Sequence, residues 1–308
     1  MISVAMATYN GEKYIIEQLD SIRRQTMPVD EVIICDDCSK DNTVRVVENY
    51  ITQHGLREKW HISVNLQNLG YASNFVGAVR KTSGDYIFFC DQDDIWVENR
   101  IETMIQIMDN HTDIKLLCSE FDSFSSSTDA PCVPKWEKRQ FKRDNSLEHL
   151  TFCAHNLFIN CQGCSMCLRR SFWKEIDQYW YQGWAHDEFV WKLALCQNGL
   201  FVYHGITLRR RLHSDNVTMH KMRDLGKRVK FLEDLQKSHE TTLTYAKNTP
   251  MNEAAYKLLT RNIKAVQLRI ALMSNRKYFN IIPLFFRYFD CYHSRKSIPV
   301  ELYMAIKG

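Results

Sequence analysis

Three carboxylates within four positions end the apolar stretch Tyr86-Ile87-Phe88-Phe89-Cys90-Asp91-Gln92-Asp93-Asp94-Ile95-Trp96. Such a continuous apolar run predicts a strand that is buried on both faces of a sheet. The acidic residues then lie where this strand leaves the sheet. Crowded carboxylates repel one another, and a divalent cation holding phosphate oxygens is a natural partner, because hard metals take oxygen ligands. The alternative is a solvated acidic turn in which Asp94 caps the next helix.

Strand and helix patterns alternate on the N-terminal side of this stretch. Short apolar strands are predicted at Ile2–Thr8, Glu31–Cys35 and Ile62–Val64. Helical spacing follows each of them, over Lys13–Gln25, over a segment that ends at Tyr50 with Ser39 or Asp41 as cap, and over Tyr71–Lys81. Repeated strand–helix units predict an α/β fold, a mainly parallel sheet with helices on both faces.

Polar residues end three of these strands. They are Thr8-Tyr9-Asn10, Asp36-Asp37 and the acidic cluster from Asp91 to Asp94. In parallel sheets, ligands bind outside the carboxyl ends of the strands. Three strand ends that all supply polar groups to one edge favour a ligand site over solvated turns.

The composition is that of a soluble globular protein with one large domain or two modest ones in 308 residues. No apolar run approaches the roughly 20 residues of a membrane helix, and Met1 leads directly into the first strand without a signal peptide. The 11 cysteines then suit free thiols in a reducing cytosol. A short strand would send Cys161 and Cys167 to one face and Cys164 to the other, and no fourth ligand completes a metal pattern.

The charge is unevenly distributed. Residues 221–308 carry 17 Lys and Arg against 7 Asp and Glu, a net charge of +10, while the rest has 23 against 29, a net charge of −6. A basic tail of this kind suits a surface that meets anionic lipid or nucleic acid.

Four motifs together resemble the family 2 glycosyltransferases of the GT-A fold, in order and spacing across roughly the first 100 residues. They are Ala7-Thr8-Tyr9-Asn10-Gly11, Asp36-Asp37-Cys38-Ser39, Asn68-Leu69-Gly70 and Asp91-Gln92-Asp93-Asp94. The resemblance implies an inverting enzyme with a nucleoside-diphosphate sugar as donor and a Mg²⁺ or Mn²⁺ ion as cofactor. It also implies a GT-A domain over residues 1–217, with a nucleotide-sugar half (1–115) and an acceptor half (116–217), followed by a helical region over 218–308.

The resemblance further implies a role for individual residues. Asp36 would accept the N3–H of a pyrimidine, which suits an acceptor-only carboxylate, Asp91 would lie near the ribose or the sugar, and Asp93 would ligate the metal. The expected nucleotide-sugar site comprises Thr8, Tyr9, Asn10, Glu12, Asp36, Asn68, Gly70, Asp91, Gln92 and Arg211.

The acceptor side is expected between residues 162 and 191. Gln162–Arg170 resembles the family segment that returns to the sheet beside the donor sugar, and Gly163 would let the backbone approach a ligand. Asp187 begins a predicted helix, where the helix dipole favours a carboxylate, and the resemblance makes it the general base. His186 is a candidate to orient Asp187 or to bind an acceptor hydroxyl, or it is a surface residue. The expected acceptor residues are Gly163, Cys164, Trp184 and His186.

The stretch Leu208–Val217 resembles the closing Arg-x-His-x-x-Asn motif of the family. Its three arginines alternate between the faces of a strand, so only some of them reach phosphate. By the resemblance His213 meets the metal or the diphosphate, between Arg211 and Asn216. The polar segment Ser119–Arg143 is expected to be a mobile loop over the site or a plain surface insertion.

The C-terminal region is expected to be helical, with apolar stripes that pack. Residues 276–296 differ, because aromatic side chains such as Phe285, Phe286 and Phe289 are flanked by basic ones. This pattern suits a membrane interface, or a helix that closes the core. We therefore expect a cytoplasmic protein, peripheral on the inner face of the cell membrane, with a lipid-linked saccharide acceptor and no nucleic-acid partner.

The donor is suggested by a short motif. Asp-Gln-Asp-Asp-Ile-Trp resembles the form found in bacterial rhamnosyltransferases of surface polysaccharide synthesis, which implies dTDP-L-rhamnose. A UDP-hexose is the alternative donor. A nucleotidyltransferase, which releases pyrophosphate, and a non-enzymatic lipid-surface binding module are the alternatives from other functional classes.

Overall fold

The computed structural model describes residues 1–127, 130–134, 137, 141–214, 224–249, 253–294 and 296–307. The chain forms two compact units. The sheet unit comprises Met1–Leu150, Cys161–Val190 and Gly199–Asn216, and the helical unit comprises Thr151–Asn160, Trp191–Asn198 and Val217–Gly308. The division of the first 217 residues into a donor half and an acceptor half stays a prediction.

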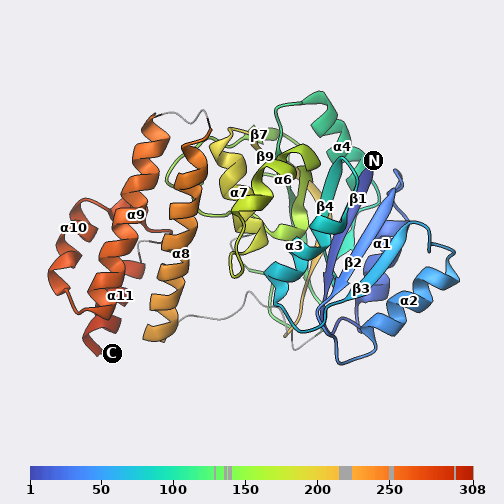
Figure 1. Ribbon diagram of the computed structural model, residues 1–308, viewed down its shortest axis with the longest axis horizontal. Helices are drawn as coiled ribbons and strands as arrows, with labels where there is room; N and C mark the ends of the chain where they lie inside the picture. Colours follow the sequence, from blue (N-terminus) through green and yellow to red (C-terminus); the bar gives the residue numbers. More distant parts are fainter. Residues whose placement is uncertain are drawn as a thin grey trace. The chain divides into compact units, whose positions relative to one another are not determined.

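The sheet has the strand order β3-β2-β1-β4-β8-β6-β9-β5, with β7 paired to β9 (Figure 1). Strands β1 to β4 are mutually parallel, and β6 is parallel to β9, while β5, β7 and β8 run antiparallel to their neighbours. The strands are β1 (Ile2–Thr8), β2 (Glu31–Asp36), β3 (Trp60–Val64), β4 (Tyr86–Asp91), β5 (Ile95–Trp96), β6 (Leu116–Ser125), β7 (Leu147–His149), β8 (Met166–Arg169) and β9 (Leu200–Leu212). The expected α/β fold with a mainly parallel core is confirmed.

The helices of the sheet unit form where apolar side chains recur at helical spacing. In α1, for example, Ile15, Leu19 and Ile22 are all buried. The helices are α1 (Ile15–Arg23), α2 (Thr43–Gln53), α3 (Tyr71–Lys81), α4 (Arg100–Asn110) and α6 (Arg170–Ile176). Helix α7 (His186–Cys196) begins in the sheet unit, and from Trp191 on it belongs to the helical unit. At the start of α2, the predicted cap Asp41 accepts the backbone N–H of Thr43 at 3.0 Å, although Asn42 occupies the cap position itself.

Strand β4 has the buried character that its sequence predicts, since Ile87, Phe88, Phe89 and Cys90 are all 0% exposed. It lies between β1 and β8. Ala7 of β1 pairs with Asp91, and the next residue, Thr8, pairs with Asp36 of β2. The register therefore brings the three polar strand ends to one edge, as expected from the sequence.

The expectation of a loop over Ser119–Arg143 is wrong for its first part, because β6 continues to Ser125. Two of the polar residues in this part, Ser119 and Glu120, are buried and pair across the sheet. The hydroxyl oxygens of Ser119 and Thr207 lie 2.6 Å apart, and Glu120 lies 2.7 Å from Nδ1 of His204. Residues 128–129, 135–136 and 138–140 lie outside the described part of the chain.

The three closely spaced cysteines do not share one strand. Cys161 precedes the short 3-10 helix η1 (Gly163–Ser165), Cys164 lies within it, and Cys167 lies in β8. All 11 cysteines are free thiols.

The helical unit packs around α8 (Leu225–Ala246) and α9 (Glu253–Ser274), which lie side by side (Figure 1). The apolar stripes predicted on these helices meet in its core, where Leu232, Leu259 and Val266 are buried. The chain then continues through η4 (Tyr278–Asn280), α10 (Ile281–Phe286), η5 (Phe289–Cys291) and α11 (Ser297–Lys307). Within the described ranges, every helix is too short or too polar to span a membrane.

A buried ion cluster joins three helices of this unit. Glu301 of α11 is 0% exposed and accepts bonds from Arg269 of α9 at 2.6 and 3.0 Å and from Arg228 of α8 at 2.7 and 3.0 Å. Arg269 is itself buried and also stacks on the ring of Tyr292 at 4.2 Å. Two guanidinium groups thus depend on one carboxylate for their counter-charge.

Replacing Glu301 by Gln is expected to destabilise the protein by about 3 kcal/mol, because it leaves buried arginine charge without a partner. Urea denaturation of the full chain measures the change. The matched control is Glu253→Gln, since Glu253 pairs with Lys257 through side chains that are 81% and 72% exposed, and this change should stay within about 0.5 kcal/mol. Equal effects of the two substitutions would show that the cluster has no special role.

Candidate active site

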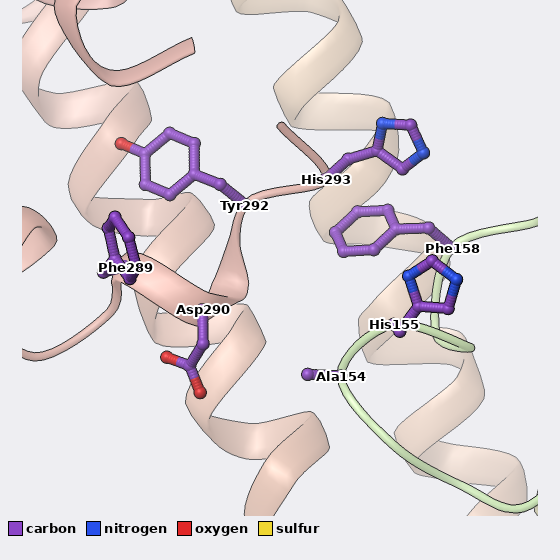
Figure 2. Close-up of a pocket in the computed structure, with 7 residues that line it drawn as sticks. All are labelled: Ala154, His155, Phe158, Phe289, Asp290, Tyr292 and His293. Carbon is purple, nitrogen blue, oxygen red and sulfur yellow. The ribbon is translucent and has the colours of Figure 1, made fainter. Parts of the chain in front are cut away.

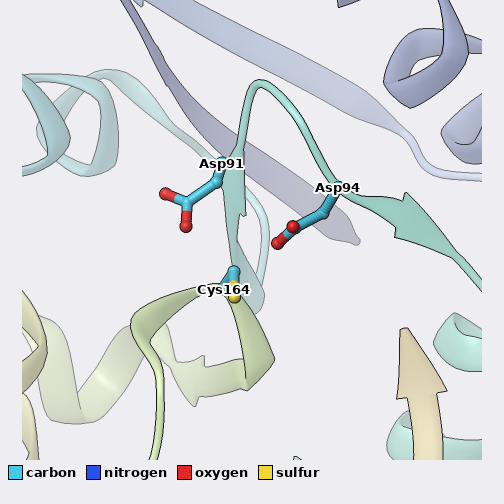
Figure 3. Close-up of side chains that lie close together, drawn as sticks. All are labelled: Asp91, Asp94 and Cys164. Carbon is cyan, nitrogen blue, oxygen red and sulfur yellow. The ribbon is translucent and has the colours of Figure 1, made fainter. Parts of the chain in front are cut away.

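The acidic turn between β4 and β5 faces the segment 163–165 (Figure 3). Figure 3 shows Asp91 and Asp94 at the two ends of this turn, with Cys164 opposite them. The possible ligand atoms of these three residues all lie within 4.8 Å of one another. Burial and the neighbouring charges of Asp94 and Asp93 raise the pKa of Asp91 well above its usual range. The arrangement concentrates negative charge at the carboxyl edge of the sheet.

Asp94 does not cap a helix, as the alternative interpretation of the turn required. It is 2% exposed and leads into strand β5. Its Oδ1 accepts the backbone N–H of Arg211 in β9 at 2.9 Å, whereas its Oδ2 has no hydrogen-bond partner among the residues that the structure describes. Burial and the charge of Asp93 raise its pKa to about 7. Asp94 therefore ties the acidic turn to β9.

The two residues expected at a metal are brought together. Nε2 of His213 lies 2.7 Å from Oδ2 of Asp93, and the ring of Tyr14 lies 5.1 Å from that of His213. Asn216, the last residue of the closing motif, lies outside the described residues.

Arg211 makes structural contacts around Asp93 and His213. Its guanidinium donates to the carbonyl oxygen of Asp93 at 2.8 Å and to Glu17 of α1 at 2.9 Å, and it lies 4.6 Å from the ring of Tyr14. The residue is only 6% exposed. Its contacts therefore hold the turn, and a direct contact with the nucleotide sugar stays a prediction.

Arg210 is a residue that sequence reasoning did not single out. The three arginines alternate along β9 as expected, since the guanidinium groups of Arg209 and Arg211 both lie 4.8 Å from the ring of Phe124, whereas that of Arg210 lies 5.9 Å from the ring of Phe121. The charge of Arg210 offsets part of the rise in the pKa of Asp91 and Asp94. Alternation along a strand predicted that only some of the arginines could face the site, but it could not tell which ones.

Thr8 and Asp36 meet at the ends of β1 and β2. Asp36 is 0% exposed, and its carboxylate accepts from the Thr8 hydroxyl at 2.8 Å and from the N–H and hydroxyl of Ser39 at 2.8 and 2.6 Å. Each carboxylate oxygen can accept two bonds, so Oδ1, which receives only the Ser39 N–H here, keeps an acceptor position.

Gln92 acts on the backbone of Tyr9. Its side-chain amide accepts the Tyr9 N–H and donates to the Tyr9 carbonyl, both at 2.9 Å. A side chain at Gly11 would come within 2.2 Å of Oε1 of Gln92, so this position must be glycine for the amide to fit. Tyr9 itself is 45% exposed. Gln92 thus positions the loop after β1, and its expected contact with the sugar stays a prediction.

The other residues of the loop after β1 contact the segment that leads into α2. Asn10 adopts a positive φ of 50°, and its side chain accepts the N–H of Lys40 at 2.7 Å. The carboxylate of Glu12 accepts the backbone N–H of Asn42 at 3.0 Å. The predicted site residues Asn10 and Glu12 therefore shape the loop.

Asp37 organises the loop that contains Asn68 and Gly70. It is 2% exposed and accepts the N–H groups of Leu69 and Gly70, both at 2.8 Å, while its carbonyl accepts from the Asn68 amide at 3.0 Å. Gly70 has a φ of +82°, which favours glycine. The motif contained Asp37, but sequence reasoning gave it no role, because only the folded loop brings these donors to it.

Asp187 lies in the first turn of α7, as predicted. Its Oδ1 accepts the N–H of Glu188 at 2.8 Å, and burial raises its pKa to about 6. Its charge acts on Asp91 and on the phenol of Tyr71, whose pKa is raised by burial and by Asp187. A Cβ atom at Gly163 would lie 3.3 Å from Cβ of Asp187, so Asp187 lies beside the segment that faces the acidic turn, and Tyr71 is a neighbour that sequence reasoning missed.

His186 is not a surface residue. It is 5% exposed, stacks on Phe75 with 4.0 Å between ring centroids, and meets the ring of Phe89 at 5.0 Å. Burial lowers its pKa to about 3, so it is neutral near pH 7. Neither ring nitrogen finds a hydrogen-bond partner in the described ranges, Asp187 included. A hydrogen bond from His186 that orients Asp187 is thus not present.

The remaining acceptor candidates lie around His186. A side chain at Gly163 would come within 2.8 Å of Nε2 of His186, so glycine permits this contact. Cys164 belongs instead to the acidic group. Trp184 is 2% exposed and packs on Phe189 with 5.0 Å between ring centroids, so its side chain belongs to the core.

The fit between Gly11 and Gln92 is open to a double-mutant test. Gln92→Ala should destabilise the protein by about 1–2 kcal/mol, because two hydrogen bonds are lost. Gly11→Ala should displace the same amide and cost a similar amount, and the double variant should cost no more than either single change. The control Gly77→Ala, where an added side chain meets no atom within 4 Å, should be neutral or stabilising in both backgrounds. Additive costs in urea denaturation would exclude the proposed fit.

Comparison with known sequences gives a match to one family. The model of glycosyl transferase family 2 matches residues 3–176. The poly(ribitol-phosphate) beta-N-acetylglucosaminyltransferase TarS of Staphylococcus aureus is 33% identical over 118 residues, covering 37% of this chain and 20% of TarS. The UDP-Glc:alpha-D-GlcNAc-diphosphoundecaprenol beta-1,3-glucosyltransferase WfgD of Escherichia coli is 32% identical over 112 residues, covering 35% and 41% of the two chains. This chain thus spans only a fifth to two fifths of these relatives.

Solved structures share the fold at lower identity. S. aureus TarS 1-349 in complex with UDP-GlcNAc superposes with a TM-score of 0.67 at 18% identity, covering 98% of this chain and 89% of that one. The mannosyltransferase PcManGT from Pyrobaculum calidifontis in complex with GDP-Man and Mn²⁺ gives a TM-score of 0.56 at 13% identity, covering 99% and 87%. The match over residues 3–176 spans more than half of the chain, from the first strand to α6. The protein belongs to glycosyl transferase family 2.

Proposed function

We propose that this protein transfers a sugar, with inversion, from a nucleoside diphosphate to a hydroxyl of a lipid-linked saccharide in the synthesis of a bacterial surface polysaccharide. The observation that carries the proposal is the acidic turn Asp91–Asp94 at the sheet edge, with Asp187, at the start of α7, beside Gly163 of the segment opposite that turn. The acidic turn suits a cation that binds a diphosphate, and Asp187 suits a general base. The name of WfgD, which specifies a diphosphoundecaprenol acceptor, supports the lipid-linked acceptor.

In the proposed reaction, the carboxylate of Asp187 takes the proton of the acceptor hydroxyl. The hydroxyl oxygen attacks the anomeric carbon as the bond from that carbon to the diphosphate oxygen breaks on the opposite face. The products are the inverted glycoside and a nucleoside diphosphate. A nucleotidyltransferase would instead release pyrophosphate, and membership of a glycosyltransferase family makes that alternative less favoured.

The donor set of the acidic turn suits a hard divalent cation. Asp93 offers carboxylate oxygens and His213 an imidazole nitrogen, and Nε2 of His213 lies 2.7 Å from Oδ2 of Asp93. Both groups are ligands for Mg²⁺ or Mn²⁺, and the nearby buried Oδ2 of Asp94 has no partner within the described residues. The thiol of Cys164 is a soft ligand and does not fit. A bound cation would neutralise the charge that grows on the leaving diphosphate. The Mn²⁺ named in the PcManGT complex supports this proposal.

For the donor, two candidates have separate support. The motif from Asp91 to Trp96 favours dTDP-L-rhamnose, while the UDP and UDP-GlcNAc complexes of TarS and the name of WfgD favour a UDP-hexose. The full chain is titrated with dTDP-rhamnose, UDP-glucose, UDP-galactose and UDP-N-acetylglucosamine. The thermal shift and the hydrolysis of each nucleotide sugar then show which donor the protein uses. Absence of any response to all four would count against the proposed function.

Asp187→Asn should lower sugar transfer or donor hydrolysis by about 10²–10⁴-fold while leaving nucleotide binding intact, because it removes the base. The base must be ionised, so wild-type turnover should be present above about pH 6, the raised pKa of Asp187, and should fall as the pH drops through that value. Rates and nucleotide titrations at pH 5 to 8 measure both effects. Near-normal turnover of the variant would contradict the mechanism.

Substitutions should distinguish the residue that binds the metal from the residue that binds the nucleobase. Asp93→Ala should abolish the part of nucleoside-diphosphate binding that depends on Mg²⁺ or Mn²⁺, whereas Asp36→Ala should weaken binding with or without metal. Calorimetric titrations of UDP and dTDP under both conditions provide the measurement. Full activity in excess chelator would rule out the metal role.

In the helical unit, aromatic side chains that the sequence predicts at a membrane interface are exposed. Phe279 is 86% exposed and Phe286 81%, and Phe285 and Ile282 are each 54% exposed. Lys277 and Arg287 are exposed beside them. Such a patch suits anionic lipid, because aromatic rings enter the interface while basic groups meet the headgroups. We propose that this patch holds the enzyme on a membrane surface.

Co-sedimentation with vesicles tests the anchoring patch. The intact protein should prefer anionic to neutral vesicles, and binding should weaken as salt screens the attraction over about 10 Å. Changing Phe285 and Phe286 to Ser should remove the salt-resistant remainder, whereas Leu66→Ser, at a fully exposed position of the sheet unit, should not. Lack of preference for anionic vesicles at low salt would exclude the anchor.

A further inference from the structure

A second candidate binding site lies entirely within the helical unit (Figure 2). It is a cavity of about 220 Å³, lined by Ala154, His155, Phe158, Phe289, Asp290, Tyr292 and His293. In Figure 2 the rings of His155, Phe158 and His293 gather on one side and those of Phe289 and Tyr292 on the other, with the carboxylate of Asp290 between them.

Both walls of this cavity are held in place. On one side, Leu157 is 0% exposed and packs with Leu259 and Ile263, and the carbonyl of Asn156 accepts the indole N–H of Trp191 at 2.7 Å. On the other side, Asp290 receives two bonds from Arg261, at 2.5 and 2.7 Å. The cavity is therefore preformed, which lowers the cost of binding a ligand.

The floor and the rim of the cavity differ in chemistry. Phe158 and Phe289 are half-buried and Tyr292 is buried, so the floor is aromatic. His155, Asp290 and His293 are exposed at the rim and offer hydrogen-bonding atoms. Aromatic side chains with a few polar groups beside them suit a sugar, because its C–H groups are apolar and its hydroxyls form hydrogen bonds.

Charge and size narrow the class of ligand. The paired Arg261 balances the charge of Asp290, so the cavity favours neither an anion nor a cation. Partial desolvation and the proximity of His155 lower the pKa of His293, which disfavours its charged form. The volume is below the roughly 300–1,000 Å³ of sites for drug-sized ligands, and suits a single ring.

We propose that this cavity binds one pyranose ring of a saccharide chain, as a subsite distinct from the one where transfer takes place. The identification of that chain with the acceptor rests on the proposed function. A transferase that elongates a saccharide benefits from a second binding site for that saccharide. Binding at this second site raises the effective concentration of the reacting end of the saccharide at the first.

Binding of simple glycosides to the full chain tests the subsite. The probes are the methyl glycosides of glucose, galactose, N-acetylglucosamine and rhamnose, followed by saturation-transfer NMR and titration, with choline and inorganic phosphate as contrasting ligands. The pocket variant changes both His155 and His293 to Ala, at exposed positions where folding should be preserved. The matched control changes His54 and His111 to Ala, which are exposed histidines of the sheet unit.

At least one glycoside should bind saturably to the wild type and to the control variant, and about tenfold more weakly to the pocket variant. UDP and dTDP should bind equally to all three proteins. No glycoside binding, or equal binding to the pocket variant, would overturn the subsite. Loss of choline binding alone in the pocket variant would make the cavity a cation site and reject the sugar. Failure of nucleotide binding, by contrast, would reject the proposed transferase and not the subsite.

Discussion

One buried hydrogen bond connects the parts of the active site. The carboxylate of Asp94 accepts the backbone N–H of Arg211, and this joins the turn after β4 to the end of β9. The side chain of Arg211 then reaches back to the carbonyl of Asp93 and to Glu17 of α1. These contacts fix the end of β9, so His213, two residues after Arg211, is held against Asp93. Together with the pairing of β5 and β9, these contacts bring the two halves of the candidate metal site together although they are far apart in sequence.

The same region keeps polar groups that the protein alone does not satisfy. Oδ2 of Asp94 and both ring nitrogens of His186 are buried without a hydrogen-bond partner in the described part of the chain. Each such group costs on the order of 1–3 kcal/mol. Groups of this kind are commonly retained at sites that bind a ligand, where the missing partner arrives with it. Around them, Asp37 and Gln92 hold the loops that carry the site through bonds to backbone groups, while Oδ2 of Asp94 and the His186 ring keep unused bonding capacity.

The helical unit has features that core packing does not explain. Its interior is stabilised by the Glu301 cluster and by the stripes of α8 and α9, yet it leaves the rings of Phe279 and Phe286 in solvent. It also forms a preformed cavity from a segment that interrupts the sheet unit in sequence, Thr151–Asn160. The proposed membrane patch and the proposed saccharide subsite would both serve the proposed lipid-linked saccharide acceptor.

The sequence by itself determined the α/β class, the strands β1 to β4 and the edge that holds the site, because apolar periodicity and the polar strand ends are local signals. It also predicted Asp187 at a helix start and the pairing of Asp93 with His213, through motifs that resemble a known family. Only the tertiary structure decided that Ser119 and Glu120 lie in a strand, since buried polar residues look like a loop until their partners Thr207 and His204 are known. Likewise, only the fold decided that Arg211 braces the turn while the charge of Arg210 reaches it, and that His186 is buried among aromatic rings. These roles depend on contacts between residues far apart in the chain, which no local pattern encodes.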